Sequence, residues 1–164
     1  MIGTTISHYK IVEKLGEGGM GIVYKAQDLN LDRHVAIKLL SPQLSGSEEN
    51  RARLSQEARA AASLNHKNIL GVHEINEHDG SVFLVMEFVE GQTLRNYISG
   101  LATGTGLPAA QAMEWVLQIA GGLKAAHSRG IVHRDIKSEN IMIDGSGNLK
   151  IMDFGLAKLK GARG

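Results

Sequence analysis

The sequence predicts an α+β protein in which a β-rich region, residues 1–90, precedes a more helical region, residues 91–164. Two observations support this prediction. Before Glu90, short β-prone segments alternate with polar or glycine-rich turns, and only one segment is rich in helix-forming residues. After Gly91, the longest periodic segment carries apolar residues at the three- and four-residue spacing of an amphipathic helix.

The first region is expected to form one sheet of five strands. The expected strands are Tyr9–Leu15, Ile22–Ala26, His34–Leu40, Ile69–Ile75 and Ser81–Val89. Polar turns between them favour antiparallel neighbours. Ser45, with Glu48 three residues later, fits a capping box, so a helix is expected from there to Leu64. Its apolar stripe is Leu54, Ala58 and Ala61.

The second region is expected to be mainly helical. Thr93–Ile98 is predicted to be a short helix and 101–107 a loop. Pro108–Ser128 is predicted to be a long helix, because Pro suits a first helical turn and apolar residues recur at helical spacing. Those apolar residues are Ala112, Val116, Ile119, Leu123 and Ala126. The remaining predicted elements are two short strands, Ile141–Ile143 and Leu149–Met152, with a turn at Asp144–Asn148 between them.

Composition narrows the class of protein. The 164 residues are 43% hydrophobic and 21% charged, which suits one compact domain or a small two-lobed unit. Basic and acidic residues number 18 and 17, a balance that gives no electrostatic reason to expect a nucleic-acid or anionic-membrane partner. There is no cysteine, which excludes disulfides and suits a reducing compartment.

The start of the chain lacks a signal-peptide pattern. The longest strongly apolar run, Val82–Met86, is too short to span a bilayer. We therefore expect a cytoplasmic chain with no membrane segment, and a membrane anchor elsewhere in a longer protein stays open.

The segment Gly16–Gly21 has the spacing G-x-G-x-x-G, which several nucleotide-binding folds share. A dinucleotide-binding unit would begin a helix at the third glycine and carry an acidic residue about 20 positions later. Here a β-prone segment follows Gly21, and Ser41-Pro42 occupies that later position. A P-loop would continue with Lys and Ser or Thr, but Ile22-Val23 follow. A hairpin tip that approaches nucleotide phosphates remains, with a merely flexible turn as the alternative.

Three further motifs follow the glycine segment in order. They are Val35-Ala36-Ile37-Lys38, His133-Arg134-Asp135-Ile136-Lys137-Ser138-Glu139-Asn140 and Asp153-Phe154-Gly155. Together with the glycine segment they match the signature set of protein kinases. From about Tyr9 to Lys158, the chain therefore resembles the catalytic domain of a eukaryotic-like Ser/Thr protein kinase. The run Glu-Gly-Gly-Met-Gly resembles bacterial members in particular.

The resemblance implies a protein-kinase-like fold. Residues 1–90 would be a complete N-lobe, with a five-stranded antiparallel sheet, one helix and the glycine-rich loop. Residues 91–164 would be an incomplete C-lobe, with the hinge, long helix, catalytic loop and Asp-Phe-Gly motif. It also implies ATP-dependent phosphoryl transfer to Ser or Thr hydroxyls of a protein substrate, with Mg²⁺, or alternatively Mn²⁺, as the metal.

The same resemblance implies roles for the catalytic residues. Lys38 would hold the α and β phosphates, and Asp135 would orient the substrate hydroxyl and accept its proton. Lys137 matches the Ser/Thr branch of the family. Glu57 is the expected partner of Lys38, because it lies near the apolar stripe of the first helix. The alternative for Glu57 is a surface pair with Arg53 at i, i+4.

Metal and nucleotide contacts follow from the same resemblance. Asn140 and Asp153 would supply oxygen ligands to the metal. The expected nucleotide contacts are Leu15, Gly16, Gly18, Gly21, Val23, Ala36, Lys38, Met86, Glu87, Val89 and Met142. Backbone groups of Glu87 and Val89 would bind the base, whereas His133 and Phe154 are expected only to pack.

The sequence departs from the family pattern after Gly155. Nine residues, Leu156–Gly164, follow it, and no Ala-Pro-Glu motif appears. We therefore expect a fragment truncated after Asp-Phe-Gly, with little activity alone and an exposed apolar face on the long helix. The alternative function is a non-catalytic nucleotide-binding or interaction module derived from a kinase. A small-molecule kinase fits less well, because such enzymes usually lack His-Arg-Asp together with Asp-Phe-Gly.

Overall fold

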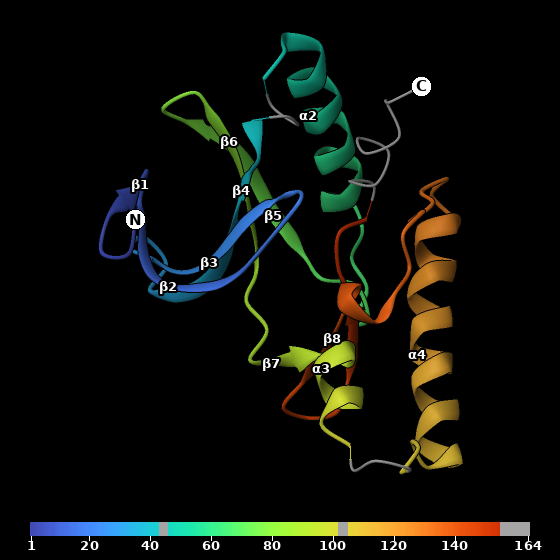
Figure 1. The fold of residues 1–164 in the computed structure, drawn as a ribbon. Helices are drawn as coiled ribbons and strands as arrows, with labels where there is room; N and C mark the ends of the chain where they lie inside the picture. The colour runs from blue at the N-terminus through green and yellow to red at the C-terminus, as the bar shows by residue number, and fades with distance from the viewer. Residues whose placement is uncertain (43–45, 102–104, 155–164) are drawn as a thin grey trace. The chain divides into compact units, whose positions relative to one another are not determined.

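The computed structural model of the chain describes residues 1–42, 46–101 and 105–154 (Figure 1). The chain forms two compact units and passes between them more than once. The first unit comprises Met1–Ala62 and Gly71–Phe88. The second comprises Ser63–Leu70 and the described residues from Val89 onward.

The first unit is built on a six-stranded sheet with the order β1-β2-β3-β4-β6-β5, in which all neighbours are antiparallel. The strands are β1 Thr5–Ile6, β2 Tyr9–Gly18, β3 Gly21–Asp28, β4 Arg33–Leu40, β5 Val72–His78 and β6 Ser81–Glu87. The five predicted strands are present, and the two-residue edge strand β1 was not predicted. The strand expected from Ile69 begins only at Val72, because Ile69 instead bridges Ile151 in the second unit.

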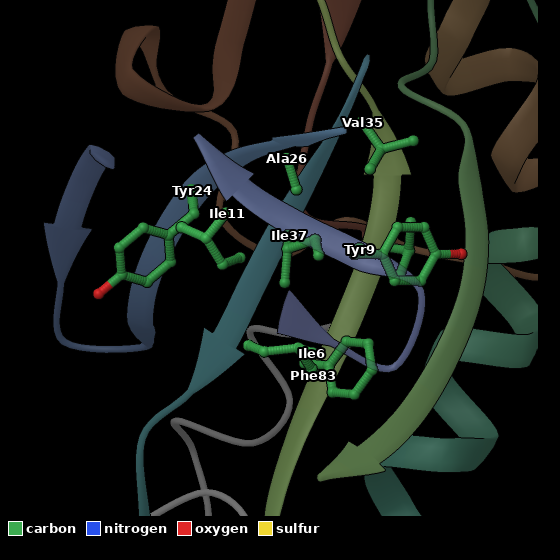
Figure 2. Close-up of a cluster of buried hydrophobic side chains, with 9 residues drawn as sticks. Ile6, Tyr9, Ile11, Tyr24, Ala26, Val35, Ile37 and Phe83 are labelled. Atoms are coloured by element: carbon green, nitrogen blue, oxygen red, sulfur yellow. The ribbon is translucent and has the colours of Figure 1, made fainter. Parts of the chain in front are cut away.

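Alternation along these strands separates the two faces of the sheet, because successive side chains of a strand point to opposite sides. One face forms a hydrophobic core (Figure 2). The core side chains are Ile6, Tyr9, Ile11, Tyr24, Ala26, Val35, Ile37, Phe83 and Val85. The other side chains of the central strands β3, β4 and β6 are therefore presented on the opposite face.

Helix α2, Glu48–Ala62, packs against β5. Its buried residues are the predicted stripe, Leu54, Ala58 and Ala61. Its first turn is capped by Ser47, whose Oγ accepts a hydrogen bond from the Asn50 amide at 3.1 Å. The predicted cap, Ser45, lies outside the described residues.

The second unit contains a three-stranded sheet with the order β7-β8-β9. Its elements are β7 Gly91–Thr93, α3 Leu94–Ser99, α4 Ala109–His127, the 3₁₀ helix η1 Ser138–Asn140, β8 Ile141–Asp144 and β9 Leu149–Ile151. Strand β7 was not predicted. Helix α3 is capped by Thr93, whose Oγ1 accepts from the Asn96 amide at 3.1 Å.

Helix α4 has nearly the predicted bounds, and part of its predicted apolar face is buried: Ala126 is fully buried and Ile119 packs against the core of the second unit. Trp115, Gly122 and Ala126 are buried, whereas the predicted core residue Val116 is 60% exposed. Trp115 takes the core position because it contacts the Tyr97 ring edge-on and donates its Nε1–H to the Gly147 carbonyl at 3.2 Å. In the part of the chain that the structure describes, no helix combines the length and apolarity needed to cross a membrane.

Candidate active site

The predicted site residues divide between the two units. Those in the first unit are Leu15, Gly16, Gly18, Gly21, Val23, Ala36, Lys38, Glu57, Met86 and Glu87. Those in the second unit are Val89, Asp135, Lys137, Asn140, Met142 and Asp153.

Strand register gathers four residues of the first unit on one face of its sheet. Val23 pairs with Lys38, and Ala36 pairs with Met86. Side chains of directly paired antiparallel residues point to the same side, and Lys38 lies two residues after Ala36 on β4. All four therefore lie on the face opposite the hydrophobic core. The family resemblance predicted these four residues as nucleotide contacts, and the strand register shows that they share one face of the sheet.

Burial differs among the predicted nucleotide contacts of the first unit. Ala36, Lys38 and Met86 are 6%, 5% and 5% exposed, whereas Leu15 is 44% exposed. A buried ammonium such as that of Lys38 requires a charged or polar partner. Glu57 is half-buried on α2, and Arg53, its alternative partner, pairs with Glu49 at 2.6 Å.

The glycine segment is the tip of a strand hairpin, as predicted, but the two strands extend further into the segment than expected. Strands β2 and β3 continue to its tip, where Gly18 pairs with Gly21. Gly21 has φ +136°, and a Cβ there would lie 1.8 Å from the Leu39 carbonyl oxygen, so the fold itself requires glycine. A Cβ on Gly16 or Gly18 would meet no atom within 4 Å. These two glycines therefore leave the open space that a phosphate group would need.

The end of strand β6 is fixed by Gly71. The Glu87 amide donates to the Gly71 carbonyl at 2.8 Å, and the Gly71 amide donates to Glu87 Oε2 at 3.2 Å. The amide of Glu87 is therefore engaged within the first unit. A contact between Glu87 and a base would therefore not use this amide.

In the second unit, the loop before β8 brings together two of the predicted catalytic residues, Asp135 and Lys137, and the predicted metal ligand Asn140. Lys137 Nζ lies 3.4 Å from Asp135 Oδ2. Asn140, which is 9% exposed, donates from Nδ2 to the Asp135 carbonyl at 2.8 Å and lies 3.4 Å from Asp135 Oδ2. Since Nδ2 of Asn140 is a donor here, its Oδ1 is the oxygen suited to a cation.

The two predicted metal ligands are joined through the backbone. The Met152 amide donates to the Asn140 carbonyl at 2.8 Å, and Asp153 follows Met152 directly. Asp153 has φ +61°, a left-handed conformation that non-glycine residues adopt at a cost and that concentrates at functional sites.

Within residues 1–42, 46–101 and 105–154, no three His, Cys, Asp or Glu side chains form a metal site. Independently of such a cluster, the amide oxygen of Asn140 and the carboxylate of Asp153 are oxygen donors that fit Mg²⁺, which commonly takes one or two carboxylates together with phosphate and water oxygens.

His133 does more than the packing predicted for it. It is 1% exposed, its Nδ1 accepts the Asp135 amide at 3.2 Å, and its Nε2 lies 2.6 Å from the Met152 carbonyl. Because Nδ1 is an acceptor, Nε2 carries the proton and donates to Met152. The ring also contacts Phe154 edge-on, at 4.8 Å between centroids. His133 therefore links the Asp135 backbone to the residue before Asp153, which no sequence signal beyond the motif indicated.

Met142 lies on β8 opposite Thr93 and is half-buried. Val89, the first residue of the second unit after β6, is also half-buried. Gly155 of the Asp-Phe-Gly motif lies outside the described residues.

Comparison with known proteins gives one family match and several relatives of the same kind. Residues 9–163 match the family described as "Protein kinase domain". Serine/threonine-protein kinase PrkC of Bacillus subtilis is 44% identical over 96% of this chain and 24% of its own length. Serine/threonine-protein kinase PknD of Mycobacterium tuberculosis is 39% identical over 96% of this chain and 23% of its own length. The chain therefore spans about a quarter of these curated relatives.

Solved structures agree with this comparison. The crystal structure of the M. tuberculosis PknI kinase domain matches with a TM-score of 0.84 and 34% sequence identity. The match covers 94% of this chain and 61% of that domain.

Proposed function

Because this chain belongs to the protein kinase domain family, we propose that it is part of a Ser/Thr protein kinase that transfers the γ-phosphoryl group of ATP to protein Ser or Thr hydroxyls. The observation that carries the proposal is the hydrogen-bonded arrangement in the second unit that joins Asp135, Asn140 and the residue before Asp153. In this proposal, residues 1–90 are the N-lobe and residues 91–164 an incomplete C-lobe.

The first unit would supply nucleotide binding. Lys38 holds the α and β phosphates, and Glu57 keeps its ammonium oriented. Gly16 and Gly18 leave room for phosphate beside the backbone, where amides can donate to its oxygens. The residues assigned to the base are Leu15, Val23, Ala36, Met86 and Met142, with the carbonyl of Glu87 and the backbone of Val89.

The second unit would supply the reacting groups. A bound Mg²⁺ or Mn²⁺ ion neutralises charge on the phosphates. Asn140 Oδ1 and the Asp153 carboxylate provide oxygen ligands for that ion. Asp135 holds the substrate hydroxyl and accepts its proton, and Lys137, at 3.4 Å from Asp135, places positive charge beside it.

Magnesium-dependent ATP binding by this chain, measured by isothermal titration calorimetry, tests the nucleotide and metal assignments. Lys38→Met and Asp153→Ala should each weaken binding by about ten-fold or more, since each removes a charge-assisted contact. Lys10→Met is the matched control for the first, because Lys10 is exposed on β2. Asp79→Ala is the control for the second, because Asp79 also has a positive φ of 49°. Equal effects of site and control variants would refute the assignments.

Phosphate transfer is tested on a longer protein, namely this chain extended by whatever the gene encodes downstream, with a generic Ser/Thr peptide as acceptor. We expect transfer by that protein, its loss in Asp135→Asn, and little transfer by the 164-residue chain. Magnesium-dependent ATP binding without transfer in the longer protein would instead favour a non-catalytic nucleotide-binding module.

A further inference from the structure

The segment Ser63–Leu70 belongs to the second unit, although it directly follows helix α2 of the first. It lies alongside strand β9 and forms a parallel bridge between Ile69 and Ile151. The Ile151 amide donates to the Asn68 carbonyl, and the Leu70 amide donates to the Ile151 carbonyl, both at 2.9 Å. The segment therefore satisfies the backbone of β9 at Ile151.

Two side-chain amides complete this edge of β9 at Leu149. Gln118 Oε1, from α4, accepts the Leu149 amide at 2.8 Å and Asn68 Nδ2 at 2.9 Å. Asn68 Nδ2 also donates to the Leu149 carbonyl at 2.9 Å. Asn68 is 2% exposed and Leu149 is fully buried, so the Asn68 amide and the Leu149 backbone have no water as a substitute partner. We call Asn68, Gln118 and the Leu149 backbone the amide clasp.

The clasp has one possible arrangement of donors and acceptors. The Leu149 N–H requires the oxygen of Gln118, and the Leu149 carbonyl requires the nitrogen of Asn68. Gln118 thus acts through its oxygen as a double acceptor. A Glu at position 118 can keep both hydrogen bonds, whereas Met, of similar length, can keep neither.

Strand β9 leads directly to the proposed metal ligand. Only Met152 separates Ile151 from Asp153, and its amide and carbonyl are bonded to Asn140 and His133. A displacement of β9 would therefore move the Asp153 carboxylate relative to Asn140. Groups that orient metal ligands without touching the metal commonly affect affinity for it.

We propose that Gln118 is a positioning residue for metal binding, which through the amide clasp holds β9 in the place where Asp153 can act with Asn140. This inference rests on the proposed function, because it assumes that Asp153 and Asn140 bind the metal that accompanies ATP.

The test compares Gln118→Met with the wild-type 164-residue chain. The readouts are the Mg²⁺ concentration that half-saturates ATP binding, and the amide exchange of Leu149 and Asp153 without nucleotide or metal. We expect the Mg²⁺ midpoint to rise about ten-fold, ATP affinity without Mg²⁺ to change less than about two-fold, and both amides to exchange faster. Gln118→Glu should restore the midpoint to within about two-fold of wild type, because it keeps both acceptors.

Gln111→Met is the matched control, because Gln111 is also half-buried on α4 but lies outside the clasp. Fluorescence of Trp115, the only tryptophan, reports whether each variant folds. A folded Gln118→Met with an unchanged Mg²⁺ midpoint would overturn the inference, and so would failure of Gln118→Glu to restore it.

If Gln118→Met does not fold, a measurement on the wild-type chain still tests the inference. Addition of Mg²⁺ to the ATP complex should slow exchange of the Leu149 amide, because the ion and the clasp act on the same strand. Unchanged exchange there would overturn the inference while leaving the proposed function intact. A wild-type chain without any Mg²⁺-dependent ATP binding would overturn both.

Discussion

At the scale of single residues, His133 shows how one buried ring can hold two functional segments. Its nitrogens bind the Asp135 amide and the Met152 carbonyl, and its neutral form suits both contacts. The His-Arg-Asp motif drew attention to His133 but predicted only a packing role for it. Its hydrogen bonds depend on the left-handed Arg134, φ +70°, and on a strand contact across 19 residues, which periodicity and propensity do not encode.

His133→Phe keeps an aromatic ring against Phe154 but removes both hydrogen bonds. Leaving a buried amide or carbonyl unpaired costs about 1–3 kcal/mol. We therefore expect the free energy of unfolding of the second unit to fall by about 2 kcal/mol or more. Urea titration followed by Trp115 fluorescence measures it. The exposed His127 gives the control, His127→Phe, which should change stability by less than about 0.5 kcal/mol; equal losses in the two variants would contradict the assigned role.

The buried Asp28, which is 1% exposed, should make the stability of the first unit depend on pH. Burial raises the pKa of Asp28, but hydrogen bonds from the Leu31 and Asn30 amides and the charges of His8 and Arg33 together hold it below its ordinary value of 3.8. The folded state therefore favours the carboxylate. Its stabilising contribution is complete above pH 3.8 and is lost as the pH falls through the lower native pKa.

Asp28→Asn removes this contribution while keeping a side-chain oxygen as acceptor. At pH 7 the variant should unfold at lower urea than the wild type, and the difference should shrink as the pH falls below 3.8. Circular dichroism of both proteins at a series of pH values measures the difference in unfolding free energy. A difference that stays constant down to the most acid pH would show that the carboxylate charge is not its source.

At the scale of elements, two adjacent glycines of α4 have opposite expected effects. A Cβ on Gly121 would lie 3.6 Å from His66 Cε1, an ordinary contact, whereas a Cβ on Gly122 would lie 3.1 Å from the Asn68 carbonyl oxygen. Alanine favours a helix over glycine by about 1 kcal/mol, and overpacking costs about 1–3 kcal/mol. Gly121→Ala should therefore stabilise the second unit by about 0.5–1 kcal/mol, and Gly122→Ala should destabilise it by about 1 kcal/mol.

Urea unfolding followed by Trp115 fluorescence compares the two variants directly, since both act in the unit that contains Trp115. Equal stabilisation by both would mean that α4 can move away from the Asn68 backbone. That result would also weaken the case for a rigid amide clasp.

Elements with a strong local pattern were predictable, and elements made by distant pairing were not. Strands β4 and β6 are short, nearly continuous apolar runs that follow polar turns, and their predicted bounds differ from the observed ones by at most two residues. Strand β7 has no such pattern and exists because it pairs with β8, about fifty residues later in the chain. In α4, apolar residues and alanines lie on more than one face of the helix. Periodicity therefore predicts a buried Val116, whereas the structure buries the neighbouring Trp115. Local periodicity cannot predict β7 or the buried face of α4, because both depend on which distant segment packs against them.

At the scale of the whole molecule, the predicted boundary at Glu90-Gly91 divides the chain once, whereas the chain passes between its two compact units more than once. The chain leaves the first unit at Ser63, contributes Asn68 and Ile69 to the second, and returns at Gly71. The motifs predicted which residues belong to the candidate site. They could not indicate that β9, which leads to the proposed metal ligand Asp153, is hydrogen-bonded to a segment that lies more than seventy residues earlier in the chain, because that pairing arises only in the folded structure.

Because each unit has its own buried core, perturbations should be local to a unit. Gly21→Ala strains the first unit, since its Cβ would lie 1.8 Å from the Leu39 oxygen, and we expect a loss of about 2–3 kcal/mol there. Amide exchange of Ile37, fully buried on β4, should accelerate, whereas the urea midpoint of Trp115 fluorescence should stay within error. Gly122→Ala should lower the urea midpoint of Trp115 fluorescence and leave the exchange of the Ile37 amide unchanged. If either variant shifts both probes equally, the two units unfold as one cooperative structure and the separate accounts of their stability are wrong.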